Sequence, residues 1–142
     1  MGVEQEQVAL RFLRYAEGRQ QDVDGLVGMM TDDCEWLINV PSSKPRIGPE
    51  AARRELERQN AMSTGLLSAS EIRSVMSNDH QVAVERVDVF EMGDKEIVLR
   101  ISGVLDIDGD KVSGWREYWD NAVLASQLGL EAAMLAETGE RP

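Results

Sequence analysis

The chain has 142 residues, and its 15 Lys and Arg against 26 Asp and Glu give a formal net charge of −11 at pH 7. An acidic chain gains no counterion-release free energy at phosphates, which argues against nucleic acid and anionic membranes as partners. The single Cys and the single His exclude an internal disulfide and a metal centre built from several cysteines or histidines of this chain.

The sequence predicts one domain over 1–142, with a core over about 3–121 and a C-terminal helix over about 121–137. No segment approaches the roughly 18 apolar residues that a membrane helix needs. The N-terminal segment MGVEQEQVAL is acidic and amphipathic, unlike a secretory signal. We therefore expect a globular protein of the cytoplasm.

Helical patterns dominate the first third of the chain. Apolar residues at helical spacing predict a helix over 3–17. Asp22 is a suitable N-cap for a short second helix, which the polar residues 31–33 should end. A third helix is expected over about 49–60, because proline is favoured in the first turn, where Pro49 would lie.

Strand patterns follow. Apolar, β-branched runs predict strands at 34–40, 68–77, 81–92, 95–107 and 111–120. Gly93-Asp94 and Asp108-Gly109 separate consecutive runs, and such dipeptides favour tight hairpin turns. Helices followed by an antiparallel meander predict an α+β fold, in which the helices cover one face of a curved sheet and leave a pocket for a small ligand.

Two charged residues interrupt the apolar run at 82–90. Every second residue of a strand points to the same face, so Arg86 and Asp88 point the same way. Both faces of this strand are largely apolar, and the pattern does not decide which face lies inside. The pair is either a solvated ion pair of little energetic weight or a desolvated pair, whose cost implies a functional reason.

Glu117 lies between Trp115 and Trp119 on one face of the last predicted strand. A carboxylate flanked by two indoles loses hydration, which raises its pKa and makes the ionised form a stronger base. The alternative is a structural glutamate that is satisfied by a cationic side chain on a neighbouring strand. The spacing leaves both interpretations open.

Three further polar or reactive side chains have modest interpretations. Asn39 closes the first predicted strand, where its amide could either hold a water molecule or form a turn. His80 lies in a polar turn and is expected to be exposed, whereas Cys34 is expected to be a small buried apolar residue. Trp36 is expected to lie in the core.

The three strand segments 85–89, 101–107 and 114–120 read ERVDV, ISGVLDI and GWREYWD. In this combination they resemble the limonene-1,2-epoxide hydrolase family of the NTF2-like, SnoaL-like superfamily. The resemblance implies an NTF2-like cone, with a curved, mostly antiparallel sheet and the N-terminal helices on its concave face. It also implies a homodimer that needs neither a metal nor an organic cofactor.

The resemblance further implies roles for individual residues. Asp88 corresponds to the general acid that protonates an epoxide oxygen, and Glu117 to the general base that activates water. Arg86 corresponds to the residue that orients both carboxyl groups, and Asn39 to the amide that positions the water. The implied reaction converts a small apolar epoxide, terpene-like or alkyl, into a vicinal diol in one step without a covalent intermediate.

Two positions depart from the family pattern. Glu117 stands where the family usually has aspartate, which moves the carboxylate by about one C–C bond. Leu37 stands where the family has a tyrosine two residues before the asparagine. One extra residue in this stretch allows a β-bulge that would place Trp36 there instead, and an indole N–H can donate a hydrogen bond but not accept one.

Other functions suit the same fold. An epoxide-opening or polyketide cyclase could use the same acid, base and arginine. A ketosteroid-isomerase-like enzyme would have an acidic base near the end of the first strand, where this chain has Asn39. A non-catalytic binding protein would keep the pocket without needing paired acids. Fold alone does not decide among these functions.

Overall fold

The computed structural model describes residues 2–17, 22–40, 44–62 and 67–129. Its helices are α1 (Val3–Tyr15), α2 (Val23–Gly28), α3 (Pro49–Met62) and α4 (Asn121–Leu128). Its strands are β1 (Met30–Leu37), β2 (Arg46–Ile47), β3 (Leu67–Ser77), β4 (Gln81–Met92), β5 (Lys95–Asp108) and β6 (Lys111–Tyr118). The predicted α+β class is confirmed.

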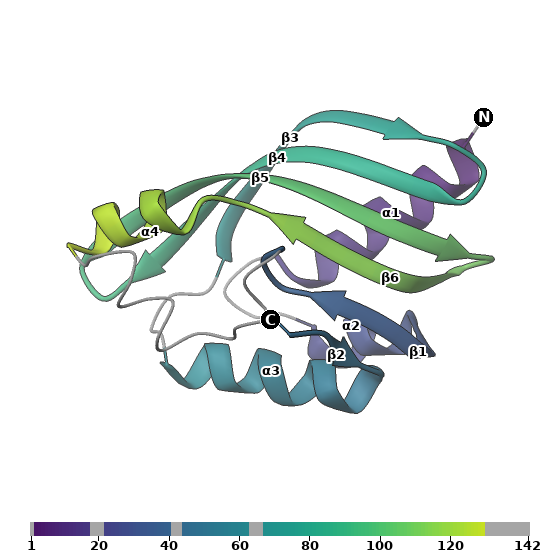
Figure 1. Cartoon of the computed structure of the whole chain (residues 1–142), viewed down its shortest axis with the longest axis horizontal. Helices are drawn as coiled ribbons and strands as arrows, with labels where there is room; N and C mark the ends of the chain where they lie inside the picture. Colours follow the sequence, from purple (N-terminus) through teal and green to yellow (C-terminus); the bar gives the residue numbers. More distant parts are fainter. Residues whose placement is uncertain (1, 18–21, 41–43, 63–66, 130–142) are drawn as a thin grey trace.

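The described strands form one curved sheet in the order β2-β1-β6-β5-β4-β3 (Figure 1). β3 to β6 form an antiparallel meander, and β1 joins β6 in parallel. The β4–β5 and β5–β6 hairpins turn at Gly93 and Gly109, whose φ angles of 66° and 62° favour glycine. The two predicted hairpins are therefore confirmed.

The inner face of the sheet is covered by α1 (Figure 1). Val8 and Phe12 of α1 belong to the same apolar cluster as the inward-pointing residues of β4 and β5, such as Val84 and Leu105. The rings of Phe12 and of Trp115 on β6 are nearly perpendicular to each other, with ring centroids 4.9 Å apart. This packing fixes which face of β4, β5 and β6 lies inside, the point that the sequence pattern left open.

A second, smaller apolar cluster lies at the other end of β5. Ile97, Leu99 and Ile101 are buried there beneath Leu124 and Leu128 of α4. The side chain of Gln127 both donates to the carbonyl of Val98 and accepts from its N–H, at 2.7 Å each. Gln127 thus continues the hydrogen bonding of the sheet where β6 has already ended.

The first strand differs from its prediction. It begins at Met30 and ends at Leu37, so residues 31–33 extend the strand instead of breaking the chain. β1 is irregular there, because its register against β6 shifts between Met30 and Glu35. Pairing with β6, a long-range interaction, outweighs the local turn preference of these polar residues.

The other differences concern short or terminal pieces. The two-residue β2 was not predicted. β6 ends at Tyr118, two residues early, because Asp120 accepts a hydrogen bond from the N–H of Ala122 and caps α4. The predicted helix over 121–137 ends earlier than expected, at Leu128, because Gly129 adopts a left-handed conformation with φ 74° and caps α4. Residues 130–137 lie outside the described residues.

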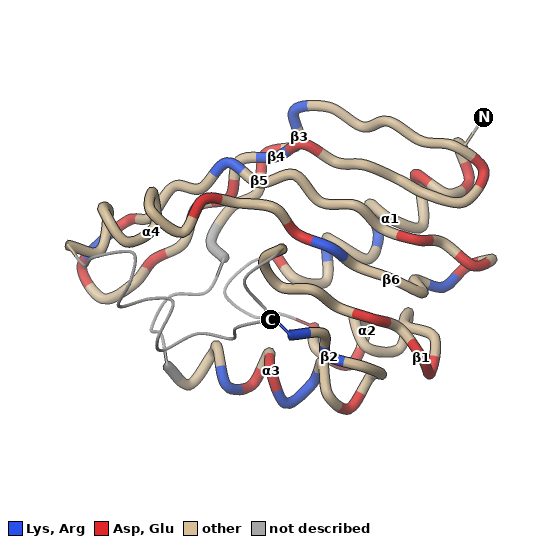
Figure 2. Tube along the Cα trace, viewed as in Figure 1, with Lys and Arg blue, Asp and Glu red and all other residues tan. Residues whose placement is uncertain are grey.

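Charged residues of both signs occur on helices and strands alike. Figure 2 shows several basic positions around α3 and β2, with acidic positions among them. No helix in the described ranges combines the length and the apolar character needed to cross a bilayer.

Candidate active site

Three charged side chains from two strands meet inside the sheet. Arg86 and Asp88 point inward from β4, and Glu117 points inward from β6. Their exposed fractions are 6%, 1% and 5%. Buried charges are rare unless they are paired, so this cluster is the strongest candidate for a functional site in the described chain.

Arg86 binds both carboxyl groups at once. Its Nε donates to Asp88 Oδ1 and Oδ2, at 3.0 Å each. Its Nη1 and Nη2 donate to Glu117 Oε2 and Oε1, at 2.9 and 2.6 Å. The planar guanidinium therefore fixes the position of one carboxyl group relative to the other.

A glycine makes room for this bridge. Gly103 lies on β5, between the two strands that carry the charges, and it pairs with Glu117 on β6. A Cβ atom on Gly103 would lie 2.6 Å from Glu117 Oε2 and 3.0 Å from Arg86 Nη1. Only a residue without a side chain leaves space for the guanidinium and the carboxylate above β5.

Ser70 on β3 is a further partner of Asp88. Its hydroxyl donates to Asp88 Oδ1 at 2.7 Å, and its backbone N–H donates to Glu17 Oε1 at 3.2 Å. Sequence reasoning missed Ser70 and the role of Gly103, although the glycine lies inside the segment 101–107. An isolated glycine in a predicted strand is the signal that could have found it, since such residues mark close approaches.

The charges of the cluster perturb one another. Burial by itself lowers the pKa of the Arg86 guanidinium, but the charges and hydrogen bonds of Glu117 and Asp88 outweigh burial and raise that pKa. Burial raises the pKa of Glu117 above its usual value, and the charge of Asp88 adds to this effect, whereas Arg86 opposes it.

One guanidinium cannot neutralise two carboxylates. With both carboxyl groups ionised, the buried cluster would carry a net charge of −1, which a site of low polarity disfavours. Retention of one proton by the cluster would remove this charge. Acid–base catalysis needs one carboxyl group that holds a proton and another that can accept one.

Asn39 lies beside the strand of Glu117. Its side chain is buried, and its Oδ1 accepts from the backbone N–H of Trp119 at 3.4 Å. The next residue, Val40, donates its N–H to the carbonyl of Glu117 at 2.9 Å. The structure thus brings Asn39 next to the end of β6.

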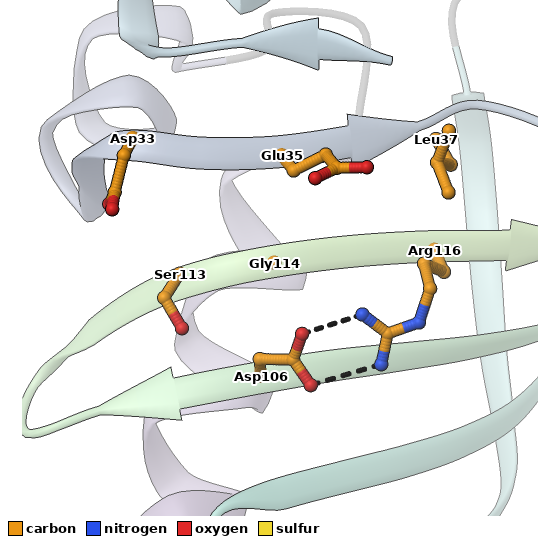
Figure 3. A pocket seen from close by; sticks show the side chains of 7 residues that line it. All are labelled: Asp33, Glu35, Leu37, Asp106, Ser113, Gly114 and Arg116. Atoms are coloured by element: carbon orange, nitrogen blue, oxygen red, sulfur yellow. Dashed lines mark hydrogen bonds and ion pairs between the residues drawn. The ribbon is translucent and has the colours of Figure 1, made fainter. Parts of the chain in front are cut away.

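Trp36 and Leu37 point in opposite directions. Trp36 is buried and stacks on Trp115, with ring centroids 4.5 Å apart. Leu37 lines a pocket on the other face of the sheet, together with the ion pair between Asp106 and Arg116 (Figure 3). The structure therefore brings Trp36 to the interior and does not bring Leu37 to the charged cluster.

His80 and Cys34 have the exposure that the sequence predicts. His80 is exposed, and Cys34 is buried. Burial raises the pKa of the Cys34 thiol to about 12, which keeps the thiol protonated at neutral pH. Within the described ranges, no group of three or more His, Cys, Asp or Glu side chains is placed to hold a metal ion.

Comparison with protein families gives one match. The family model for the limonene-1,2-epoxide hydrolase catalytic domain matches residues 3–129. None of the curated proteins compared with this chain matches it.

Several solved structures are similar to this one. A limonene-epoxide-hydrolase-like epoxide hydrolase of M. tuberculosis has a TM-score of 0.71 at 20% identity, over 94% of this chain and 95% of that chain. A protein from Shewanella denitrificans, named as a SnoaL-like polyketide cyclase, has a TM-score of 0.77 at 14% identity, over 89% and 98% of the chains. The epoxide hydrolase/cyclase-like enzyme SalBIII has a TM-score of 0.68 at 19% identity, over 84% and 95%. At these identities the similarities show the fold, which is NTF2-like and SnoaL-like as expected.

Proposed function

Because the chain belongs to the limonene-1,2-epoxide hydrolase family, we propose that it adds water to an epoxide and releases a vicinal diol without a cofactor. The observation that supports this most strongly is the buried Arg86, which holds the carboxyl groups of Asp88 and Glu117 in fixed positions. A site that opens an epoxide needs both an acid and a base, and this one provides two carboxyl groups that are held by one guanidinium.

The acid acts on the epoxide oxygen. An alkoxide is a poor leaving group, so the C–O bond breaks more easily when a proton is delivered as it breaks. In the proposed step Asp88 gives its proton to this oxygen and becomes a carboxylate. Arg86 Nε, which already donates to both oxygens of Asp88, stabilises the charge that forms.

The base acts on water. A water molecule attacks the epoxide carbon through an oxygen lone pair while Glu117 takes one of its protons, so no covalent bond to the protein forms. The raised pKa of Glu117 makes its carboxylate a stronger base than an exposed glutamate. Asn39 is the proposed second partner of this water. The site is restored when Glu117 loses its proton to solvent and Asp88 regains one.

An apolar substrate suits the surroundings of the charged cluster. On β5, Gly103 separates Leu105 of the main core from Ile101, Leu99 and Ile97 of the second cluster. The charged residues therefore form a narrow polar band between two apolar regions. We infer a small epoxide with aliphatic substituents, terpene-like or alkyl, because burial of its carbon skeleton is favourable there.

The test is turnover of a panel of small epoxides by the wild type and by Asp88→Asn and Glu117→Gln. Each carboxamide variant should lose at least ~10²-fold in kcat/KM, because positioned acids and bases typically contribute 10²–10⁴-fold. Asp106→Asn is the matched control, since Asp106 forms an ion pair with Arg116 on the outer face of the sheet. Retained activity in both site variants would refute the proposal.

A second candidate is an epoxide-opening cyclase, because SalBIII is described as having a role in pyran ring formation. In that reaction a hydroxyl group of the substrate replaces water, and the same acid and base suffice. An epoxide that carries a hydroxyl group within reach of the ring distinguishes the two reactions. A cyclic ether as the main product would favour the cyclase, and a diol the hydrolase.

A further inference from the structure

The two oxygens of the Asp88 carboxyl group have different surroundings. Oδ1 accepts from the Ser70 hydroxyl at 2.7 Å and from Arg86 Nε at 3.0 Å. Among the described residues, Oδ2 accepts only from the same Arg86 Nε, at 3.0 Å, so this N–H forms a bifurcated hydrogen bond with both oxygens. Ser70 is thus the group that makes one oxygen of Asp88 different from the other.

This difference decides where a proton can sit. An oxygen that already accepts two hydrogen bonds has little capacity to carry a proton of its own. A proton on Asp88 is therefore favoured on Oδ2. Once that proton has left, the carboxylate still accepts the hydrogen bond from Ser70, which stabilises the ionised form.

We propose that Ser70 is a positioning residue that directs the proton of Asp88 to Oδ2, and so makes Oδ2 the atom that protonates the substrate. This inference rests on the proposed function, because it concerns the acid of that reaction. In the step, the Oδ2–H bond breaks and a new O–H bond forms on the epoxide oxygen as its C–O bond breaks. Ser70 neither gains nor loses a proton.

Ser70 is itself held in place. Its backbone N–H donates to Glu17 Oε1, two residues after the end of α1, and Ser70 lies opposite Asp88 in the pairing of β3 with β4. The hydroxyl therefore approaches Asp88 from the directly paired position on the neighbouring strand.

The same pair of strands supplies a matched control. Ser74 also lies on β3 and also donates its hydroxyl to a carboxylate on β4, Glu85 Oε1, at 3.2 Å. The register of β3 shifts between Ile72 and Ser74, and Ser74 pairs with the exposed Glu85. A serine-to-alanine change at 74 thus removes a similar hydrogen bond from the same strand pair outside the site.

The experiment compares Ser70→Ala, Ser70→Thr and Ser74→Ala with the wild type, with kcat and KM measured from pH 4 to 10 on an epoxide that the wild type hydrolyses. Ser70→Ala should lower kcat by ~10-fold or more with little change in KM, since hydrogen bonds to charged groups carry free energies of that order. Ser70→Thr keeps the hydroxyl and should restore the wild-type profile, and Ser74→Ala should leave it unchanged.

Several results would overturn the inference. Wild-type kcat and pH profile in Ser70→Ala would show that the hydroxyl has no part in proton delivery. Equal losses in Ser70→Ala and Ser70→Thr, or in Ser70→Ala and Ser74→Ala, would point to packing or sheet pairing instead, and thermal unfolding of each variant measures that contribution. A wild type that hydrolyses no epoxide would refute the proposed function itself and this role with it, a result distinct from unchanged kinetics in Ser70→Ala.

Discussion

Gly103 and Glu117 lie opposite each other on β5 and β6, and the Glu117 carboxylate bends over the glycine so closely that a Cβ there would be 2.6 Å from Oε2. Real Cβ atoms do not approach an oxygen so closely. The position of the proposed base therefore depends on the missing side chain of its neighbour.

The first prediction concerns Gly103→Ala. The added methyl group should displace the Glu117 carboxylate and break at least one of its two hydrogen bonds to Arg86. We expect kcat/KM to fall by up to about 100-fold, since misplacement of a reacting group by about 1 Å can cost that much. Ser102→Ala is the control, because Ser102 is the exposed neighbour on the outer face. Full activity in Gly103→Ala would mean that catalysis does not depend on the present position of the Glu117 carboxylate.

The second prediction concerns the side-chain length of the proposed base, Glu117. Aspartate at position 117 would be too short to keep both hydrogen bonds to Arg86, now 2.9 and 2.6 Å, without a shift of the backbone. Glu117→Asp should therefore lower kcat by about 10- to 100-fold, although aspartate is usual in the family. Glu85→Asp, at an exposed position on β4, should have wild-type kinetics. Equal or higher activity in Glu117→Asp would show that catalysis does not depend on the longer side chain of Glu117.

The third prediction separates the acid from the base. Azide is an anionic nucleophile that opens an epoxide without a general base, but the ring oxygen still needs a proton. Azide should therefore restore ring opening in Glu117→Gln, with an azido alcohol as product, and should not do so in Asp88→Asn. Chromatography of the products measures both variants. Rescue of Asp88→Asn alone would reverse the two assigned roles.

The fourth prediction follows from the raised pKa of Glu117. The base works only when it is ionised, so activity falls as the pH drops through its pKa. Because burial raises this pKa above the usual 4.5, the acid limb of kcat/KM should lie above pH 4.5. Full activity down to pH 4.5 would contradict a raised pKa of Glu117 as the proposed base.

The strands of the second half could be predicted from the sequence because their signals are local. Alternating Val and Ile residues and the glycine turns define β4, β5 and β6 within one or two residues. The two successive hairpins then place 86 and 88 on β4 and 117 on β6, on either side of β5. Helix α1 determines which face is buried, and that contact joins residues far apart in the sequence.

The parts that could not be predicted depend on register. Counting by twos along β3 places Ser70, Ile72 and Ser74 on one face, but the shift between Ile72 and Ser74 moves Ser74 to the other. The register shift in β1 leaves Trp36 inside and Leu37 outside. A bulge moves side chains from one face to the other and has no reliable signal in a single sequence.

The most direct test of the central claim, that the bridged carboxyl groups add water to an epoxide in one step, is a single-turnover reaction in ¹⁸O-labelled water with enzyme in excess. Every diol molecule formed in this first turnover should carry one ¹⁸O atom, because the attacking oxygen comes from water and no ester with the protein forms. An unlabelled diol would show attack by a carboxylate oxygen, and an epoxide that stays unconsumed or closes to a cyclic ether would contradict hydrolysis itself.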